Sequence, residues 1–372
     1  MSIRILPVTR PRQLRQFIQF RHHLYRGDPH YVPELYLSER AFLGRNNPFF
    51  LHSQATYFLA FSGKRPVGRI AAILNQKHLD RYKDHTGFFG FFDAEDDPLV
   101  AGALLDAAFD WLRQRGLRKV IGPENFTTNH AVGVLTQGFD QPAVVQMPYN
   151  KPYYEQLLTG QGLAKKMELY AYRFYQVRLP ASFVERGRRI EGRLQKRGIR
   201  IRPVDFKRFG PEMEQLRRVY NAANEGHWGF VPLTPEEFRF LADDLRRIVR
   251  PENVLLAERE GQLVGYLVTV PDINQVLKQI PDGRLFPWGW AKLLARPRLS
   301  GSRMLILGIL PAFRNLGIDW CFYARASLFY QRQGVEWTEA CYVMQDNRMM
   351  NRIIQKIGGA PVKTYRLYGK EL

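Results

Sequence analysis

The sequence predicts an α/β (α+β) protein of two tandem domains, each a mixed, mainly antiparallel twisted sheet flanked by helices. One observation is size: the chain has 372 residues, enough for two ordinary domains, and the 45% hydrophobic content of a folded protein. The other is an internal repeat, in which landmarks of the first half recur in the second half in the same order and at constant spacing. Gly90, Gly116 and Asn129 recur as Gly308, Gly334 and Asn347.

The two halves share the order of their predicted elements. Each opens with a short strand that ends in Pro-Val, at residues 3–8 and 199–204, and a helical pattern of apolar residues follows. Two strands joined by a tight turn come next, and their second strand contains Val67-Gly68 in one half and Val264-Gly265 in the other. This recurrence predicts that both halves fold on one plan.

After this turn each half continues with a third strand, a long helix, a further strand and a last helix. In the second half we expect the long helix at about residues 318–333 and the next strand at 336–343. The last helix covers about residues 348–357, because Gly358-Gly359 ends the helical pattern there. Strands that alternate with helices in this way predict a sheet of mixed direction.

The repeat predicts an N-terminal domain at residues 1–178 and a C-terminal domain at residues 199–372, joined by a basic linker helix at 179–198. The charge of this linker allows two interpretations, a solvated helix that bridges the domains or a docking surface for an anionic partner. The basic residues that run from the linker into the next strand are Arg186, Arg188, Arg189, Arg193, Lys196, Arg197, Arg200 and Arg202.

The composition predicts an anionic partner. With 55 basic and 35 acidic residues, the formal net charge is +20, which suits nucleic acid, an acidic carrier protein, a phosphorylated cofactor or an anionic membrane. The two cysteines, Cys321 and Cys341, match no metal spacing, so we expect no metal and no disulfide framework. The N-terminus lacks the pattern of a signal peptide and no apolar run suits a spanning helix. We therefore expect a cytoplasmic protein that contacts the inner face of a membrane at most peripherally.

A basic turn in the second half has the features of an anion site. The apolar strand 304–310 runs into this turn, which contains Arg314 and Gly317, and the helix 318–333 begins directly after it. The start of a helix offers free backbone N–H groups and the positive end of the helix dipole. Gly317 lets the backbone approach a phosphate closely, and Arg314 adds a positive charge. The first half has Asp96-Asp97-Pro98 at the corresponding turn, which would repel an anion.

From Arg314 to Asp319 the chain resembles the acyl-CoA pyrophosphate loop of the GNAT (Gcn5-related N-acetyltransferase) superfamily, whose pattern is Q/R-x-x-G-x-G/A. Arg314 and Gly317 fit this pattern, whereas Asp319 stands in place of the final small residue. The strand, helix and closing strand that follow keep the family's order. The resemblance implies two tandem GNAT-like domains, of which the first has a degenerate cofactor loop.

The resemblance also implies a co-substrate, acyl-CoA or an acyl carrier protein, that binds to the second domain only. The pantetheine arm would lie along the strand that ends at Leu310, and the pyrophosphate would lie at the turn. The implied cofactor-binding residues are Leu307, Gly308, Ile309, Leu310, Arg314, Asn315, Leu316, Gly317, Ile318, Asp319 and Asn347.

Transfer of an acyl group to an amine needs a base for the ammonium proton and a donor for the thioester oxygen. Many GNAT proteins carry an acidic residue on the first cofactor strand, but this strand has none. The candidates for catalysis are therefore Glu339, Asp272, His227, Asn347 and Tyr365. Each also has a structural interpretation. Glu339 is then a paired strand carboxylate, Asp272 forms a turn and His227 is a packed loop histidine. Asn347 is then a helix N-cap and Tyr365 a core tyrosine.

An insertion at residues 275–303 lengthens the second half just before the cofactor strand. It contains Phe286, Trp288 and Trp290 between basic residues, which is the composition of a segment that lies in a membrane interface or lines a site for a long acyl chain. An ordinary amphipathic lid is the alternative. The first interpretation makes the chain similar to bacterial ceramide synthases, which are long-chain N-acyltransferases.

Three functions fit these patterns. The preferred one is an acyl-CoA-dependent N-acyltransferase that acts on an amine, with a long-chain or lipid amine as the acceptor. A tRNA-dependent aminoacyl transferase is the second, since those enzymes also resemble paired GNAT domains and need a basic surface; the retained Arg-Gly turn makes nucleic acid the less favoured partner. The third is a non-catalytic protein that binds acyl-CoA or a membrane.

Overall fold

The computed structural model describes residues 2–176, 179–295 and 298–372. It divides into two compact units. The first unit contains residues 1–169, 274–296 and 363–372, and the second contains residues 170–273 and 297–362. Each unit therefore consists mainly of one half of the chain and also holds the strand segment that ends the other half.

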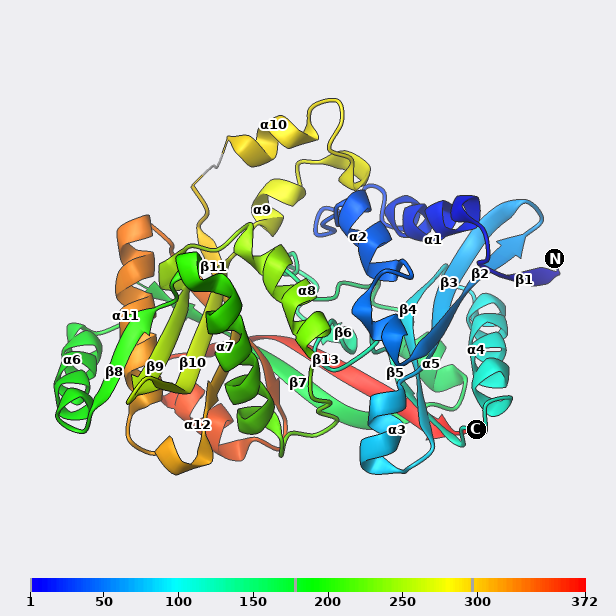
Figure 1. Ribbon diagram of the computed structural model, residues 1–372. Helices are drawn as coiled ribbons and strands as arrows, with labels where there is room; N and C mark the ends of the chain where they lie inside the picture. The colour runs from blue at the N-terminus through cyan, green and yellow to red at the C-terminus, as the bar shows by residue number, and fades with distance from the viewer. Residues whose placement is uncertain (1, 177–178, 296–297) are drawn as a thin grey trace. The chain divides into compact units, whose positions relative to one another are not determined.

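In the first unit the sheet has the strand order β1-β2-β3-β4-β5-β13, and β6 also pairs with β13 (Figure 1). Neighbouring strands are antiparallel except β4 and β5, which are parallel. The strands are β1 (Ile3–Pro7), β2 (Gln54–Ser62), β3 (Arg65–Leu74), β4 (Thr86–Ala94), β5 (Lys119–Gly122), β6 (Val134–Gln137) and β13 (Ala360–Glu371). The helices are α1 (Pro11–Leu24), α2 (Tyr36–Leu43), η1 (Pro48–Leu51), α3 (Gln76–Tyr82), α4 (Pro98–Arg113), α5 (Tyr154–Gly160), α9 (Asn274–Leu277), η5 (Pro281–Gly283) and α10 (Gly289–Leu294).

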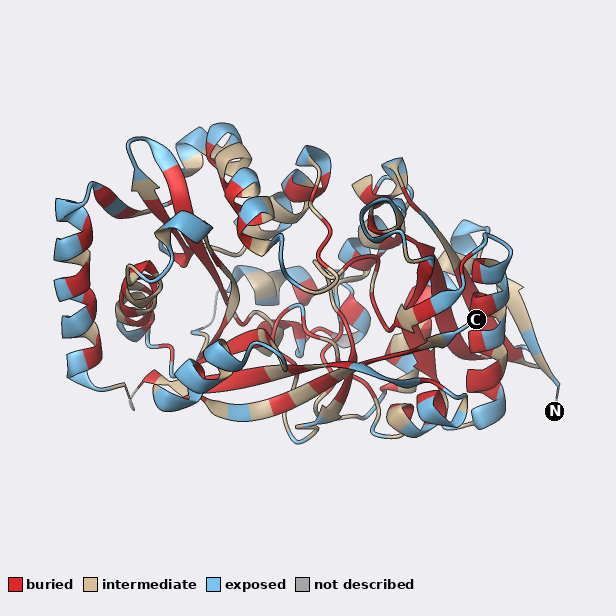
Figure 2. Cartoon of the chain, turned by 90° about the horizontal axis from the view of Figure 1, so that it is seen from below, coloured by how far each residue is buried: buried red, intermediate tan, exposed pale blue. Residues whose placement is uncertain are grey.

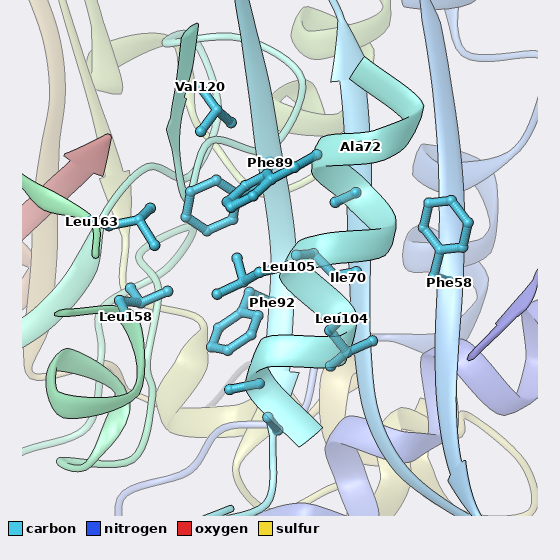
Figure 3. Packing of buried hydrophobic residues seen from close by; sticks show 14 of the residues in the cluster. Phe58, Ile70, Ala72, Phe89, Phe92, Leu104, Leu105, Val120, Leu158 and Leu163 are labelled. Carbon is cyan, nitrogen blue, oxygen red and sulfur yellow. The ribbon is translucent and has the colours of Figure 1, made fainter. Parts of the chain in front are cut away.

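Helices cover both faces of this sheet. Alternate residues of β2 point to opposite faces, so Phe58 joins the core under α4 and Leu59 joins the core under α1 and α2. Figure 3 shows Leu104 and Leu105 of α4 among the apolar side chains of the adjacent strands. The spacing of apolar residues in α4, which is that of one helix face, produces this packing.

The second unit repeats the arrangement, with the strand order β8-β9-β10-β11-β12-β7. Only β11 and β12 are parallel among the pairs β8–β9, β9–β10, β10–β11 and β11–β12. The strands are β7 (Ala164–Tyr175), whose residues 170–175 belong to this unit, β8 (Ile199–Pro203), β9 (Val254–Arg259), β10 (Gln262–Pro271), β11 (Gly301–Ile309) and β12 (Trp337–Met344). The helices are α6 (Ala181–Lys196), η3 (Phe206–Arg208), α7 (Phe209–Asn224), α8 (Pro235–Arg246), η4 (Pro251–Asn253), η6 (Pro311–Phe313), α11 (Ile318–Gln333) and α12 (Arg348–Lys356).

The second sheet is also covered on both faces. Leu255 of β9 packs with α6 and α11, and its neighbour Leu256 packs with α7 and α8 on the opposite face. Two sheets of the same strand order and direction, each between layers of helices, confirm the predicted fold class and the predicted duplication of the plan.

The predicted linker helix exists as α6, but it is part of the second unit. Its buried residues Phe183, Gly187, Ile190 and Leu194 form one face of the helix. Ile190 and Leu194 belong to the same apolar cluster as α11. In Figure 1, α6 is at the left edge, and Figure 2 shows buried residues on one side of this helix and exposed residues on the other. Packing of this face decides against a solvated bridge, while the outer face stays exposed and basic.

The inserted segment packs differently from the prediction. Residues 274–296 belong to the first compact unit, although they interrupt the second half of the sequence. The Asn274 side-chain amide donates a hydrogen bond to the carbonyl oxygen of Ala143 (2.8 Å), and Gly283 lies so close to Glu34 that an added Cβ would be 1.8 Å from its carbonyl oxygen. The boundaries at residues 178 and 199 remain predictions about the repeat, because β7 and β13 are each divided between the units.

Candidate functional site

The parallel strands β11 and β12 pair over only part of their length. Their pairing runs from Gly301 opposite Trp337 to Met304 opposite Ala340, whereas β11 continues to Ile309 and β12 to Met344. On its other edge β11 stays paired with β10 as far as Ile309 opposite Gly265. Within the described residues, the β12-facing edge of β11 from Leu305 onward is therefore outside the strand ladder. Such an edge offers N–H and C=O groups to an extended ligand that contains amides.

The helix α11 begins at this end of β11 without a side-chain cap. Its N-cap residue is Gly317, whose φ of 87° is in the left-handed region that favours glycine. An added Cβ at Gly317 would also be only 2.8 Å from Cγ2 of Ile190. The N–H groups of the first helical turn have no partner within the helix, and they lie at the positive end of its dipole. The structure therefore has an uncapped helix start at the turn for which the sequence predicts an anion site, and the binding of an anion there stays a prediction.

Arg314 is fixed beside this helix start. Its Nε donates a hydrogen bond to the carbonyl oxygen of Ile309 (3.2 Å), and its Nη2 donates to that of Ala223 at the end of α7 (3.1 Å). The side chain remains exposed. A positive charge therefore lies at the end of β11, next to the N–H groups of α11.

At the corresponding turn of the first unit, the helix start is capped by a side chain. Asp97 is the N-cap of α4, and its carboxylate accepts a hydrogen bond from the N–H of Leu99 (2.8 Å). Pro98, the first residue of α4, has no N–H to offer. The connection is also shorter, with residues 95–97 between β4 and α4 against residues 310–317 between β11 and α11. A carboxylate thus occupies the place where an anion would bind.

The gap between the parallel strands of the first unit is also closed. The β4–β5 pairing ends at Phe88 opposite Ile121. Beyond it, the N–H of Glu124 donates to the carbonyl oxygen of Phe89 (2.7 Å), and the N–H of Phe91 donates to Oδ1 of Asn125 (2.8 Å). The segment after β5 therefore forms hydrogen bonds with β4 beyond the end of the β4–β5 pairing. The corresponding residues of β11 lie beyond the end of the β11–β12 pairing.

Among the predicted catalytic residues, His227 is affected by the charge of Arg314 in the turn before α11. It follows α7 at an exposed position, where its surroundings still desolvate part of the ring. Burial lowers the pKa of His227 below its usual 6.5, the positive charge of Arg314 lowers it further, and Asp346 acts in the opposite direction. The imidazole is therefore neutral at pH 7, and this form accepts a proton.

Glu339 and Asp272 are both buried. Glu339 is 0% exposed on β12, and Arg173 of β7 donates a hydrogen bond to its Oε2 (2.8 Å). Within the described residues its other oxygen has no hydrogen-bond partner. Asp272 directly follows β10, and its N–H donates to the carbonyl oxygen of Gly301 (2.9 Å). These contacts agree with a structural interpretation of both residues.

Asn347 and Tyr365 also make structural contacts. Asn347 is the N-cap of α12, and its side chain accepts a hydrogen bond from the N–H of Met350 (3.1 Å). Tyr365 is fully buried on β13, opposite Leu135 of β6 in the first unit. The structure thus places His227, Arg314 and the residues next to Asn347 in one electrostatic neighbourhood, and assigns Tyr365 to the packing of the other unit.

Two residues of this site were missed in the sequence. Tyr266 of β10 is fully buried, and its hydroxyl accepts a hydrogen bond from the side-chain amide of Asn224 (2.9 Å). The same hydroxyl would be only 2.4 Å from a Cβ added at Gly308 of β11. A glycine inside a strand is a known sign of close approach by another group, and Gly308 was the available signal.

Comparisons with known proteins are consistent with this geometry. The chain is 33% identical to a bacterial ceramide synthase of Caulobacter vibrioides, over 100% of this chain and 98% of that protein. It is also 33% identical to protein YghO of Escherichia coli, over 96% of this chain and 93% of the relative. No family model matches the chain.

Solved structures agree on the fold. A tandem GNAT protein from the clavulanic acid biosynthesis pathway matches with a TM-score of 0.58 and 11% identity, over 100% of this chain and 98% of that one. A GCN5-related N-acetyltransferase of Anabaena variabilis matches with a TM-score of 0.54 and 9% identity, over 99% of this chain and 72% of that one. The full-length relatives and the shared fold together give the identity: the chain belongs to the bacterial ceramide synthase family and has the tandem GNAT acyltransferase fold.

Proposed function

We propose that this protein transfers an acyl group from acyl-CoA to an amine. The observation that carries the proposal is the uncapped start of α11 at Gly317, which follows the end of β11 whose last residues, 305–309, are outside the pairing with β12. A helix start of this kind suits a pyrophosphate, and a free strand edge suits the amides of a pantetheine arm. The same two features are blocked in the first unit by Asp97 and by the segment after β5.

The residues that would hold the donor follow from this placement. N–H groups of the first turn of α11 would bind the pyrophosphate, and Arg314 would add its charge. Backbone groups of Leu307, Gly308 and Ile309 would pair with the pantetheine arm and fix the thioester at the end of β11. Asn315, Leu316 and Asp319 shape the turn between the strand and the helix, and Asp319 limits how an anion approaches the first turn.

We assign the base to His227. The amine nitrogen attacks the thioester carbonyl, the C–S bond breaks, the thiolate leaves with the electron pair, and one proton leaves the nitrogen. A neutral His227 accepts that proton, because its pKa lies below 6.5. Glu339, Asp272 and Asn347 hold the strands and the helix around the site through the contacts described above, and Tyr365 belongs to the core.

The acceptor is proposed to be a hydrophobic amine. One relative is named a bacterial ceramide synthase, and we carry a long-chain acyl group and a lipid amine over to this chain as the substrate class. An acyl carrier protein presents its acyl group on the same arm as CoA, so it is a second source of the same donor chemistry.

A membrane surface would supply such an acceptor. The inserted segment exposes Phe286 (78%), Trp288 (73%), Trp290 (44%) and Leu294 (68%). Arg284 and Lys292 are exposed in the same stretch. Exposed aromatic side chains next to basic ones favour binding in the interface of an anionic bilayer. In the described part of the chain no helix is long and apolar enough to cross a membrane. We propose peripheral binding at the inner face of the membrane.

Replacement of Gly317 by Asp is expected to weaken CoA binding by about tenfold or more, because a carboxylate at the helix start repels the pyrophosphate. Calorimetry with CoA measures the affinity. Gly334→Asp is the matched control, since Gly334 caps the other end of α11 and also has a left-handed backbone. Arg314→Glu tests the same anion site at an exposed side chain. Unchanged CoA affinity in folded Gly317→Asp and Arg314→Glu variants would rule out this donor site.

The rate of acyl transfer is expected to depend on the protonation of His227. Because the pKa of His227 is lowered, kcat/KM should stay constant near pH 7 and fall as the pH drops below 6.5 through that pKa. His227→Gln should reduce kcat by about a hundredfold and remove this acidic limb, with little change in CoA affinity. His23→Gln is the control at an exposed histidine. A His227→Gln enzyme with wild-type kcat contradicts the assignment of the base.

Binding to vesicles tests the membrane contact. Replacement of both Phe286 and Trp288 by Ser should lower the fraction that sediments with phosphatidylglycerol-containing vesicles by about tenfold, because the apolar anchors are lost. Leu51→Ser with Leu99→Ser removes two leucines that are similarly exposed in the first unit, and serves as the control. Equal sedimentation of both double variants would show that residues 286–288 are not a membrane anchor.

A further inference from the structure

The outer face of α6 carries a row of basic side chains that we call the α6 basic stripe. It consists of Arg186, Arg189, Arg193 and Lys196, all exposed. Their spacing of three or four residues places them on one flank of the helix, beside the buried face. Within the described residues no carboxylate forms an ion pair with these four. On the other flank, Glu191 pairs with Arg325 of α11.

The α6 basic stripe lies next to the start of α11. Ile190 of α6 is the residue whose Cγ2 would be 2.8 Å from a Cβ at Gly317. One turn earlier, the guanidinium of Arg186 lies 4.3 Å from the ring centroid of Trp320, whose Nε1 donates to the carbonyl oxygen of Phe183 (3.1 Å). The stripe is therefore continuous with the proposed donor site.

The charge of Arg193 affects the pKa of Cys321 in the first turn of α11. Burial is the main cause that raises the pKa of the Cys321 thiol to about 12, and the charge of Arg193 is among those that oppose the rise. Cys321 is the first residue whose N–H bonds within α11, to the carbonyl oxygen of Gly317. This electrostatic effect agrees with the contacts of Ile190 and Trp320 and places the stripe beside the same helix turn.

The α6 basic stripe is longer than the surface that a pyrophosphate contacts. From Arg186 to Lys196 the helix rises by about 15 Å, because each residue adds about 1.5 Å. A phosphate group contacts only one part of such a row, whereas an acidic helix of another protein matches its length. The exposed residues between the basic ones, such as Gly192, add no apolar anchor, so the stripe lacks the composition that inserts into a bilayer.

We propose that the α6 basic stripe docks an acidic acyl carrier protein, which delivers its acyl chain on a phosphopantetheine arm at the start of α11. This inference rests on the proposed function, since it names the protein that presents the donor at the same site. Complementary charge brings such partners together quickly and orients them, so the stripe raises the rate of productive encounter. CoA lacks this protein surface and uses the turn alone.

Charge reversal separates the stripe from the donor site. In the stripe variant, Arg189→Glu and Lys196→Glu are combined. Arg186 is kept because it packs on Trp320, and Arg193 is kept because its charge acts on the first turn of α11. With a bacterial acyl carrier protein loaded with palmitate as donor, kcat/KM should fall by about tenfold or more, whereas with palmitoyl-CoA it should change by less than about threefold. The control variant combines Arg188→Glu and Lys207→Glu, two residues that are exposed outside the stripe.

Fluorescence anisotropy with labelled holo carrier protein gives a second measurement that needs no turnover. The wild type should bind with an affinity that falls with salt, the stripe variant should bind at least about tenfold more weakly, and the control should bind like the wild type. An equal fall with both donors would show that the stripe serves the phosphates of CoA and would overturn docking. Loss of tRNA binding in the stripe variant without any change in carrier binding would overturn it as well.

The two measurements distinguish failure of docking from failure of the proposed function. Transfer from palmitoyl-CoA with carrier binding that is indifferent to the stripe refutes docking and leaves the function standing. Carrier binding that needs the stripe, in a protein that transfers acyl groups from neither donor to any amine tested, supports docking and refutes the transferase.

Discussion

The left-handed backbone at Gly317 is the constraint on which the proposed donor site depends. It lets α11 begin without a side-chain cap, so that the N–H groups of its first turn remain available. It also leaves room for Ile190 of α6, which would collide with any Cβ at this position. The helix start, the packing of α6 and the position of Arg314 at the end of β11 are therefore parts of one arrangement.

The two sheets share strand order and direction, yet only one of them keeps the features of a donor site. In the first unit, Asp97 caps α4 and Asn125 binds the N–H of Phe91, so the helix start and the strand edge are both in use. Each of these bonds stabilises the first unit and removes a group that an acyl-CoA would need. Both copies thus keep the fold, while the proposed donor site belongs to the second copy alone. The end of β7, from the first half of the sequence, belongs to the second unit, and the end of β13, from the second half, belongs to the first unit. Neither half of the sequence therefore contains all the strands of one unit.

Local patterns in the sequence were sufficient to predict the fold, and they also led to the proposed donor turn. The recurrence of Gly90 and Gly116 as Gly308 and Gly334 predicted the duplication, because glycine marks turns and close approaches in both copies. Arg314 and Gly317 predicted an anion site from a local pattern as well, and this site stays a prediction. The long helix was predicted at about 318–333, and α11 covers Ile318–Gln333.

These local patterns did not predict the contacts between residues that are far apart in the sequence. The partner of Glu339 is Arg173, which comes from the last strand of the other half, and no periodicity reveals that pair. Tyr266 was missed because an alternating apolar strand does not show which tyrosine lies against Gly308. The insertion was assigned to the second domain by its place in the chain, whereas its contacts with Ala143 and Glu34 place residues 274–296 in the first unit. Such assignments follow from tertiary packing, which sequence position does not determine.

The central claim is that one copy of the fold binds the donor and the other does not. The stoichiometry of CoA binding, measured by calorimetry on the intact chain, tests it most directly. The account predicts one CoA per chain. Two CoA molecules per chain, or one CoA that still binds when the start of α11 is blocked, would contradict it.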